Sequence, residues 1–322
     1  FILWDLYTTR AVLLAGLQAF VLGDYVAVGS AVYNFFFGEA YYSHYQRFSP
    51  SEQSNPDGFG FIVVLGLPVA WYLASSMTTP KMNGLLKFLN YGFIPAALLG
   101  IALSGTRTAV IAAIPAMAFG LASLTRLRLW ARVTIFVLLT SAILVLLPHV
   151  QTLTSFQRFS TISSELGGGD FNQRGGLWRE GLAAFTESPL IGVGANRYRS
   201  VNSLGKLAHN SFISVLVELG VIGFALFGSI LMIAVIEAWR QPKWEASFWL
   251  TWLAVWTIGA SSLTYEYRKA TWLILSLLIV SGALTANREE DVAPAGLKPS
   301  AGKFVPQSNT TNSQTAKAGV SS

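Results

Sequence analysis

Long apolar stretches alternate with short polar ones along most of this chain. A stretch of about 20 apolar residues is long enough to cross the hydrocarbon core of a membrane as an α-helix. The pattern predicts about eight such helices, separated mainly by short loops. They are expected at residues 10–31, 58–76, 88–105, 107–124, 131–148, 210–238, 246–263 and 269–286. The predicted fold class is therefore all-α, a polytopic bundle of transmembrane helices.

Basic residues in the short loops predict the orientation of this bundle. If the spans alternate, the basic loops at 77–87, 125–132 and 239–245 fall on one face together with the C-terminal tail. Because short cytoplasmic loops carry an excess of Lys and Arg, this face is expected to be cytoplasmic. The opposite face then carries residues 32–57, the long loop 149–208 and the turns SGTR and TYEYR. We expect a bacterial inner membrane protein whose long loop is periplasmic.

The chain is predicted to consist of a transmembrane domain, residues 1–286, followed by a tail, residues 287–322. The tail is rich in Ser, Thr, Asn, Ala and Gly and has little to bury, which is typical of a disordered segment. At the other end, apolar helix follows soon after Phe1, without a signal-peptide pattern. We therefore expect that further spans of a longer membrane protein precede Phe1.

One segment of the long loop has the periodicity of a short amphipathic helix. Trp178, Leu182 and Phe185 recur at i, i+4 and i+7, which places them on one helix face. Such a helix is expected to lie in the membrane surface rather than to cross the membrane. Pro189 would end it, and the glycines of the following GVG sequence would allow a tight turn.

The amino-acid composition and the missing motifs limit the kinds of binding site that the chain could contain. The chain is 52% hydrophobic and 12% charged, carries a net charge of +6, and has no cysteine and three histidines. Thiolate metal sites are therefore excluded, and the scattered histidines do not predict a metal cluster. The sequence lacks a P-loop, a dinucleotide fingerprint and the basic runs that bind nucleic acid. We expect no metal, no cofactor and no nucleic acid, so a substrate would have to arrive already activated.

Two arginines at the predicted outer face have two interpretations each. Arg107 lies in the SGTR turn between two spans, and Arg174 lies in the long loop. Either guanidinium could reach lipid headgroups as an interfacial side chain. Alternatively, a guanidinium held between helices could grip a phosphate group in forked geometry.

The most apolar predicted span begins with the segment AHNSFISVLVELG, which contains several polar residues. His209 could be an interfacial residue or a general base, because imidazole titrates near neutral pH. Asn210 is a favoured helix N-cap. Asn210, Ser214 and Glu218 recur at i, i+4 and i+8, so they form a polar stripe that should face protein or water rather than lipid. A structural role that locks the helix of His209 is favoured for Glu218.

Several of these segments resemble a known family. The stretches LSGTRTAVIAAIPA, RGGLWREGLAAFTESPLIGVGANRYRS and AHNSFISVLVELGVIGFALF look like the successive signatures of the O-antigen ligase and polymerase family. The stretch RFSPSEQSNPDGFGFIVVLGLPVAWYLA is similar to a less specific upstream part. The resemblance extends over roughly residues 10–285, with the segments in the same order.

The resemblance implies an inverting, metal-independent membrane glycosyltransferase. Its donor would be a glycan linked to the membrane lipid undecaprenyl pyrophosphate, presented at the periplasmic face of the membrane. Its acceptor would be a hydroxyl group of lipid A-core, a glycan repeat or a protein. The phosphate-gripping arginines of the family would be Arg107 and Arg174, and its catalytic histidine would be His209. Such enzymes have about a dozen spans, which fits the expectation that spans precede Phe1. Supporting candidates for substrate binding are Arg197, Arg199, Asn210 and Glu218.

Three alternatives stay open. A flippase or transporter could move the lipid-linked anionic glycan without covalent chemistry, and basic groups at mid-membrane depth would indicate it. The predicted spans contain no Lys or Arg at mid-span, which favours chemistry at the outer end. A non-catalytic scaffold has the same sequence features. Within the enzyme class, ligases and polymerases share these residues.

Overall fold

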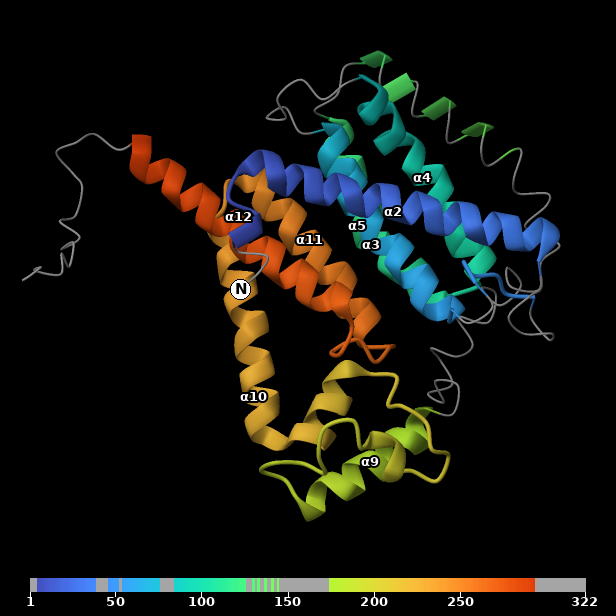
Figure 1. Cartoon of the computed structure of the whole chain (residues 1–322), viewed down its shortest axis with the longest axis vertical. Coiled ribbons are helices and arrows are strands. Elements are labelled where there is room, and N and C mark those ends of the chain that lie inside the picture. Colours follow the sequence, from blue (N-terminus) through green and yellow to red (C-terminus); the bar gives the residue numbers. More distant parts are fainter. Residues whose placement is uncertain are drawn as a thin grey trace, which may run out of the picture. The chain divides into compact units, whose positions relative to one another are not determined.

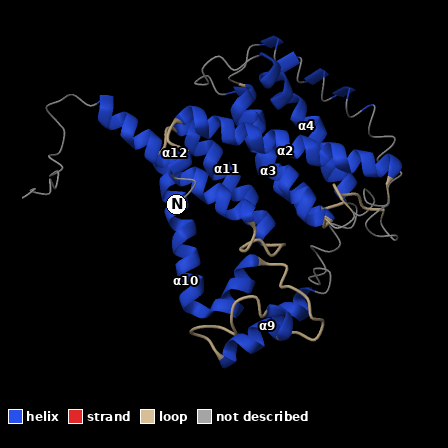
Figure 2. Ribbon diagram, viewed as in Figure 1, coloured by secondary structure: helices blue, strands red, loops and turns tan. Residues whose placement is uncertain are grey.

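The structure is a computed structural model that describes residues 5–38, 46–51, 54–75, 84–125, several positions between 129 and 144, and 174–292. It confirms an all-helical fold, and no strand occurs among these residues (Figure 1, Figure 2). The helices are α2 (Arg10–Phe37), α3 (Pro56–Ser75), α4 (Gly84–Ser104), α5 (Arg107–Leu124), α9 (Arg174–Glu187), α10 (Ser211–Arg240), α11 (Lys243–Ala260) and α12 (Lys269–Val292), with a 3-10 turn at Tyr198–Ser200.

Six helices of the described chain are long and apolar enough to cross a membrane. They are α2, α3, α4, α5, α10 and the segment Lys269–Ala286 of α12. The chain is therefore a multi-pass membrane protein, although fewer spans are seen than the eight predicted. The predicted span 131–148 lies largely outside the described residues. The segment predicted at 246–263 is α11, whose Lys243, Glu245 and four Trp lower its mean hydropathy.

Helix α3 lies at the centre of the bundle. It contacts α2, α4, α5 and α11, and Phe61, Leu65 and Trp71 are among its fully buried side chains. A helix that is apolar on every side is stable only when other helices cover it. Helix α11 covers one side of α3, where Phe248 stacks on Tyr72 with ring centroids 4.2 Å apart.

Polar contacts mark the two ends of the bundle. At one end, Arg10 at the start of α2 contacts Glu245 of α11 at 2.6 Å and the hydroxyl of Tyr72 in α3 at 3.2 Å. At the other end, the hydroxyl of Tyr265, between α11 and α12, donates to the carbonyl of Gly58 near the start of α3 at 3.2 Å. Helices α2 and α11 begin where α3 ends, which agrees with alternating spans.

Helix α10 is broken, although the sequence pattern predicted one continuous span at 210–238. The break is at Gly220, where φ is 66° and ψ is −170°. Loop 189–194 inserts there and replaces the lost helical hydrogen bonds. The new bonds run from Val193 N to Val217 O (3.0 Å), Gly194 N to Glu218 O (2.9 Å), Val221 N to Pro189 O (2.9 Å) and Ile222 N to Leu190 O (3.2 Å). The 20 residues that follow the break are about 30 Å long, enough to cross the hydrocarbon core.

This insertion requires glycine on both sides. Gly192 and Gly220 have φ values of 71° and 66°, in the left-handed region that L side chains rarely adopt. A Cβ on Gly192 would lie 2.6 Å from the nitrogen of Gly220, and a Cβ on Gly220 would lie 2.5 Å from the nitrogen of Ile191. Both neighbours are backbone atoms, which cannot move aside without breaking the insertion.

The chain divides into two compact units, Phe1–Thr285 and Ala286–Ser322. The first contains the helical bundle and α9. Helix α12 ends at Val292, and the rest of the predicted tail lies outside the described residues.

Gly220→Ala is expected to destabilise the folded chain by about 2 kcal/mol or more, because left-handed strain and overlap with backbone both oppose the added Cβ. The matched control is Gly228→Ala on the same helix, where nothing lies within 4 Å of the added Cβ. It should leave stability unchanged or raise it by up to about 1 kcal/mol. Denaturant unfolding in micelles measures both variants, and equal effects would contradict the interpretation of the break.

Candidate functional site

His209 stands immediately before α10 in a strained backbone conformation. Its φ is 49°, which for a residue with a side chain costs on the order of 1–3 kcal/mol. Its N–H donates to Oγ1 of Thr264 at 3.2 Å, which ties it to the turn between α11 and α12. Asn210 caps α10 as predicted, because its side-chain oxygen accepts from the N–H groups of Phe212 (3.0 Å) and Ile213 (3.1 Å). The half-buried imidazole is thus attached to a fixed backbone.

Helix α9 confirms the short helix predicted within the long loop. Its Trp178 donates the indole N–H to the carbonyl of Ala208, the residue before His209, at 2.8 Å. Arg174 lies one helical turn before Trp178 and therefore on the same face of α9. From this helix the charge of Arg174 acts on His209.

The packing face of α9 passes through Leu177 and Gly181, both of which are buried. The carbonyl of Leu177 accepts from the hydroxyl of the fully buried Tyr198 at 2.8 Å. Leu182, which was predicted to share the apolar face with Trp178, is 40% exposed. Only part of the predicted apolar face is therefore used to dock α9 on the protein.

The electrostatic surroundings of His209 favour the neutral imidazole. Burial lowers its pKa, and the charge of Arg174 lowers it further. The carboxylate of Asp57 opposes this shift, while Lys206 and Arg199 reinforce it. Burial and the neighbouring cations therefore favour the form of His209 that can accept a proton.

Arg107 is the first residue of α5, and that helix start is connected to the start of α10. The hydroxyl of Thr106 donates to the carbonyl of Pro56 in α3 at 3.0 Å. Tyr265, which bonds to α3 from the α11–α12 turn, donates its N–H to Oγ of Ser211 at 2.8 Å. Polar contacts through α3 therefore link the helix starts that carry two of the predicted chemical residues.

The other basic candidates lie on the surface of the 196–206 segment. Arg197 and Arg199 are both exposed, and they flank the buried Tyr198. Arg199 is among the charges that lower the pKa of His209. Their roles in substrate binding stay predictions.

Glu218 holds the loop that fills the break in α10. The side chain is 1% exposed, and its carboxylate accepts from the N–H of Asn196 at 2.8 Å, the N–H of Tyr198 at 3.0 Å and the hydroxyl of Tyr267. The carboxylate therefore joins α10 to the 196–198 turn and to the turn between α11 and α12. This geometry supports the structural role favoured for Glu218.

A buried carboxyl group lies nearby that the sequence analysis did not single out. Glu266 is 5% exposed, and within the described chain neither of its side-chain oxygens has a partner at hydrogen-bonding geometry. Burial raises its pKa, more than the neighbouring hydroxyls of Ser214 and Ser211 lower it. Glu266 was not found because it stands in a short loop, TYEYR, that looks exposed in the sequence.

The sequence also did not predict that Arg47 and Asp57 lie near the site. Arg47 is 4% exposed, and its Nε donates to the carbonyl of Ser104 at 2.7 Å. Its Nη2 lies 2.5 Å from Oδ1 of Asp57 and 3.3 Å from Oγ1 of Thr106. The available signal was that both charged residues lie in the outer segment, beside the start of a span.

The site is rich in cations rather than in metal ligands. Arg174, Lys206 and Arg199 all act on His209. Among the residues that the structure describes, no group of three or more His, Asp and Glu side chains could hold a metal ion. Guanidinium and ammonium groups of this kind bind phosphate.

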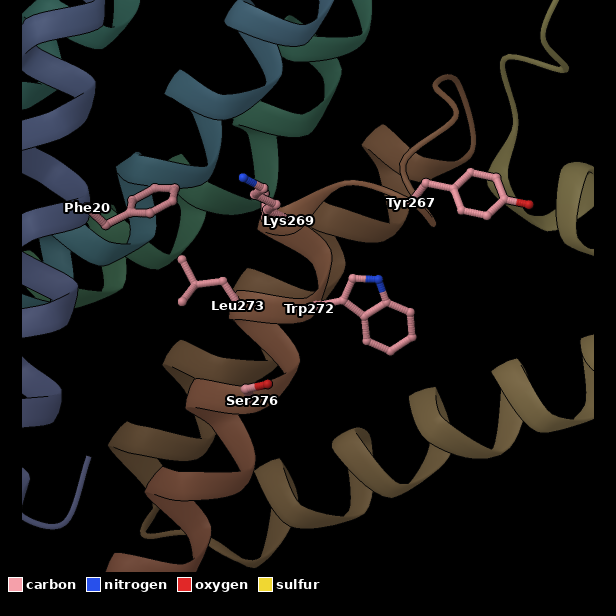
Figure 3. A pocket seen from close by; sticks show the side chains of 7 residues that line it. Phe20, Tyr267, Lys269, Trp272, Leu273 and Ser276 are labelled. Atoms are coloured by element: carbon pink, nitrogen blue, oxygen red, sulfur yellow. The ribbon is translucent and has the colours of Figure 1, made fainter. Parts of the chain in front are cut away.

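An apolar cavity of about 520 Å³ lies between α2 and the start of α12. Figure 3 shows Lys269, Leu273 and Ser276 along α12, with Phe20 on the facing helix. The remaining lining residues are Tyr267, Ala270 and Trp272. Because Tyr267 also donates to Glu218, one wall of the cavity belongs to the structure that supports the His209 site.

Glu218→Gln is expected to lower the free energy of unfolding by about 1.5–3 kcal/mol. The amide NH2 of Gln cannot accept hydrogen bonds, so at least one of the donors that now bind the carboxylate would lose its acceptor. Amide hydrogen exchange of residues 189–200 should accelerate. Glu237→Gln, which removes only the exposed contact with Arg240, is the control and should change little. Unchanged exchange in Glu218→Gln would contradict the proposed support of this loop.

Glu266→Gln tests the buried carboxyl by its pH dependence. A raised pKa means that the neutral form is favoured in the folded state, so this contribution is present below the ordinary pKa of Glu and is lost as pH rises through the raised pKa. Because Gln is always neutral, the variant should gain stability relative to the parent as pH rises. Thermal unfolding between acidic and neutral pH measures this difference, and a pH-independent difference would show that the pKa of Glu266 is not raised in the folded chain.

The central part of this chain matches a known protein family. The family model described as O-antigen ligase matches residues 93–228. A comparison with curated proteins finds no match. The matched segment contains Arg107, Arg174, His209 and Glu218, together with the broken first part of α10. This match of residues 93–228 supports the O-antigen ligase family that the sequence predicted.

Proposed function

We propose that this protein is a metal-independent, inverting glycosyltransferase that moves or polymerises a glycan from undecaprenyl pyrophosphate. The observation that carries the proposal is the position of His209, which is fixed in front of α10 by Thr264 and lies within the electrostatic range of Arg174. A base next to a guanidinium suits a reaction in which a hydroxyl group loses a proton while a phosphate gains negative charge. The family match of residues 93–228 agrees with this chemistry.

In the proposed reaction, His209 accepts the proton of the acceptor hydroxyl as the hydroxyl oxygen attacks the anomeric carbon of the donor. The bond between this carbon and the pyrophosphate oxygen breaks, and its electron pair leaves with the lipid pyrophosphate. Attack from the side opposite the leaving group inverts the anomeric centre. The guanidinium groups of Arg174 and Arg107 stabilise the charge that develops on the pyrophosphate.

The remaining candidates divide between support and binding. Glu218 and Asn210 stabilise the structure around the site. The carboxylate of Glu218 and the side-chain oxygen of Asn210 accept hydrogen bonds from backbone N–H groups. We assign Arg199 to the electrostatic attraction of the anionic donor, since its charge already acts on His209. Arg197 is exposed beside it and would contribute at longer range.

The lipid part of the donor requires an apolar surface beside this site. We assign the lipid part to the cavity between α2 and α12. Both helices are candidate membrane spans, so surfaces that other helices do not cover would contact the hydrocarbon core. The proposal places this end of the bundle at the periplasmic face of a bacterial inner membrane. The acceptor hydroxyl would belong to lipid A-core, a glycan repeat or a protein.

One observation favours the alternative, a flippase that moves the lipid-linked glycan unchanged. Asp24 of α2 is 4% exposed, and its Oδ2 lacks a hydrogen-bond partner among the described residues. Carboxyl groups inside membrane spans often serve transport. Arg and Lys, however, do not occur among the buried residues of the described spans, and the cations near His209 lie outside them. Chemistry at the end of the bundle therefore remains the preferred function.

Transfer from a lipid-pyrophosphate glycan to an acceptor, assayed with the full-length protein, tests the proposal. His209→Ala should lower the rate by about 100-fold or more, the ordinary contribution of a general base. Arg174→Ala and Arg107→Ala should each lower it by about 100- to 1,000-fold. The matched control is Arg179→Ala, an exposed arginine of the same helix α9, which should retain activity. Full activity of His209→Ala, or lipid movement without transfer, would favour the flippase.

A further inference from the structure

We infer that Asp57 is a positioning residue for His209: its carboxylate, at the start of α3, stabilises the imidazolium that forms when His209 accepts a proton. The inference rests on the proposed function, because only there does His209 act as a base. It adds a third segment, far from both α9 and α10 in sequence, to the proposed site. Asp57 lies outside the matched residues 93–228.

Asp57 is fixed by a buried arginine. Its Oδ1 lies 2.5 Å from Nη2 of Arg47, whose side chain is only 5% exposed. Arg47 is in turn held by the carbonyl of Ser104, and the N–H of Asp57 donates to Oδ1 of Asn55 at 2.9 Å. A buried guanidinium needs a counter-charge, so this pair holds the carboxylate of Asp57 in place. The carboxylate side chain nevertheless stays 29% exposed, so the pair does not enclose it.

The turn between α11 and α12 brings Asp57 and His209 together. From one side, the hydroxyl of Tyr265 donates to the carbonyl of Gly58, the residue after Asp57, at 3.2 Å. From the other side, Oγ1 of Thr264 accepts the N–H of His209 at 3.2 Å. Adjacent residues of one turn therefore hold the backbone next to Asp57 and the backbone of His209. The negative charge of Asp57 raises the pKa of His209, as this arrangement requires.

The charge balance around His209 explains why such a carboxylate is needed. The charges that act on it are Arg174 from α9, Lys206 and Arg199 from the loop before α10, and Asp57 from α3. Of these four described charges, Asp57 alone is negative. A proton taken up by His209 would otherwise create a fourth positive charge in a half-buried place. Asp57 offsets it at the moment of transfer.

The test is the titration of His209 in Asp57→Asn, followed by histidine NMR of the full chain in lipid nanodiscs. The chain has three histidines, so His209→Gln assigns the signal. In Asp57→Asn the pKa of His209 should fall. With a donor and an acceptor present, the acidic limb of kcat/KM should move to lower pH, and the plateau rate should fall by less than the loss in His209→Ala. A merely structural role of Asp57 would lower the rate without moving the limb.

Three variants complete the experiment. Asp57→Glu keeps the negative charge and should retain the titration of His209. Glu187→Gln, an exposed carboxyl group on α9, is the matched control and should leave the titration unchanged. Asp57→Ser is a second neutral variant for the case that Asp57→Asn does not fold, with the same expected fall in pKa. An unchanged titration in a folded neutral variant overturns the inference.

The two proposals fail separately. The titration does not need glycosyl transfer, so a shifted pKa in a protein that transfers nothing would leave the pairing intact and refute the proposed function. Efficient transfer together with an unmoved titration would leave the function intact and refute the role of Asp57.

Discussion

The exchange of backbone hydrogen bonds at Gly220 is the constraint on which the rest of the site depends. A helix interrupted near the membrane leaves N–H and C=O groups that must find new partners. Loop 189–194 supplies all four replacement bonds, and it can approach closely only because Gly192 and Gly220 lack side chains. The break turns the first part of α10 away from the crossing segment and gives it a protein surface on which α9 docks. His209 begins this first part, so its position follows from the break.

Charged and polar groups then fix the parts that the break brings together. Glu218, at the break, binds the N–H groups of the 196–198 turn, and Tyr198 in that turn binds α9. On the bundle side, Arg47 joins Asp57 to the start of α5. Each of these side chains comes from a different part of the sequence, yet each bonds to backbone or to a residue fixed by backbone. The candidate site is therefore rigid on the side of the protein, and its exposed cations are available to a substrate.

The sequence allowed the fold class, six of the eight predicted membrane spans and the short helix α9 to be predicted, because these depend on local hydrophobic periodicity. The cap formed by Asn210 was predictable for the same reason. The break in α10 was not, since Gly220 within an apolar run has no local signal that separates a tolerated glycine from a broken helix. Asp57, Arg47 and Glu266 were missed because their importance comes from burial or from contacts that the local sequence does not show, such as the bond from Arg47 to the carbonyl of Ser104. Hydrophobic pattern determines where helices lie, whereas buried polar contacts depend on how the helices meet.

In the proposed reaction, the two central arginines would meet the anionic donor at helix starts. Arg107 and Arg174 are both the first residues of helices, α5 and α9. The N-terminus of a helix carries partial positive charge, so a cation there is unfavourable by about 0.3–1 kcal/mol. His209, itself strained, precedes a third helix start. In the proposed site these two cations stand beside positive helix ends, near a base whose pKa is lowered by burial and by Arg174. A pyrophosphate placed among them would reverse the sign of these interactions, because helix N-termini and guanidinium groups both stabilise negative charge.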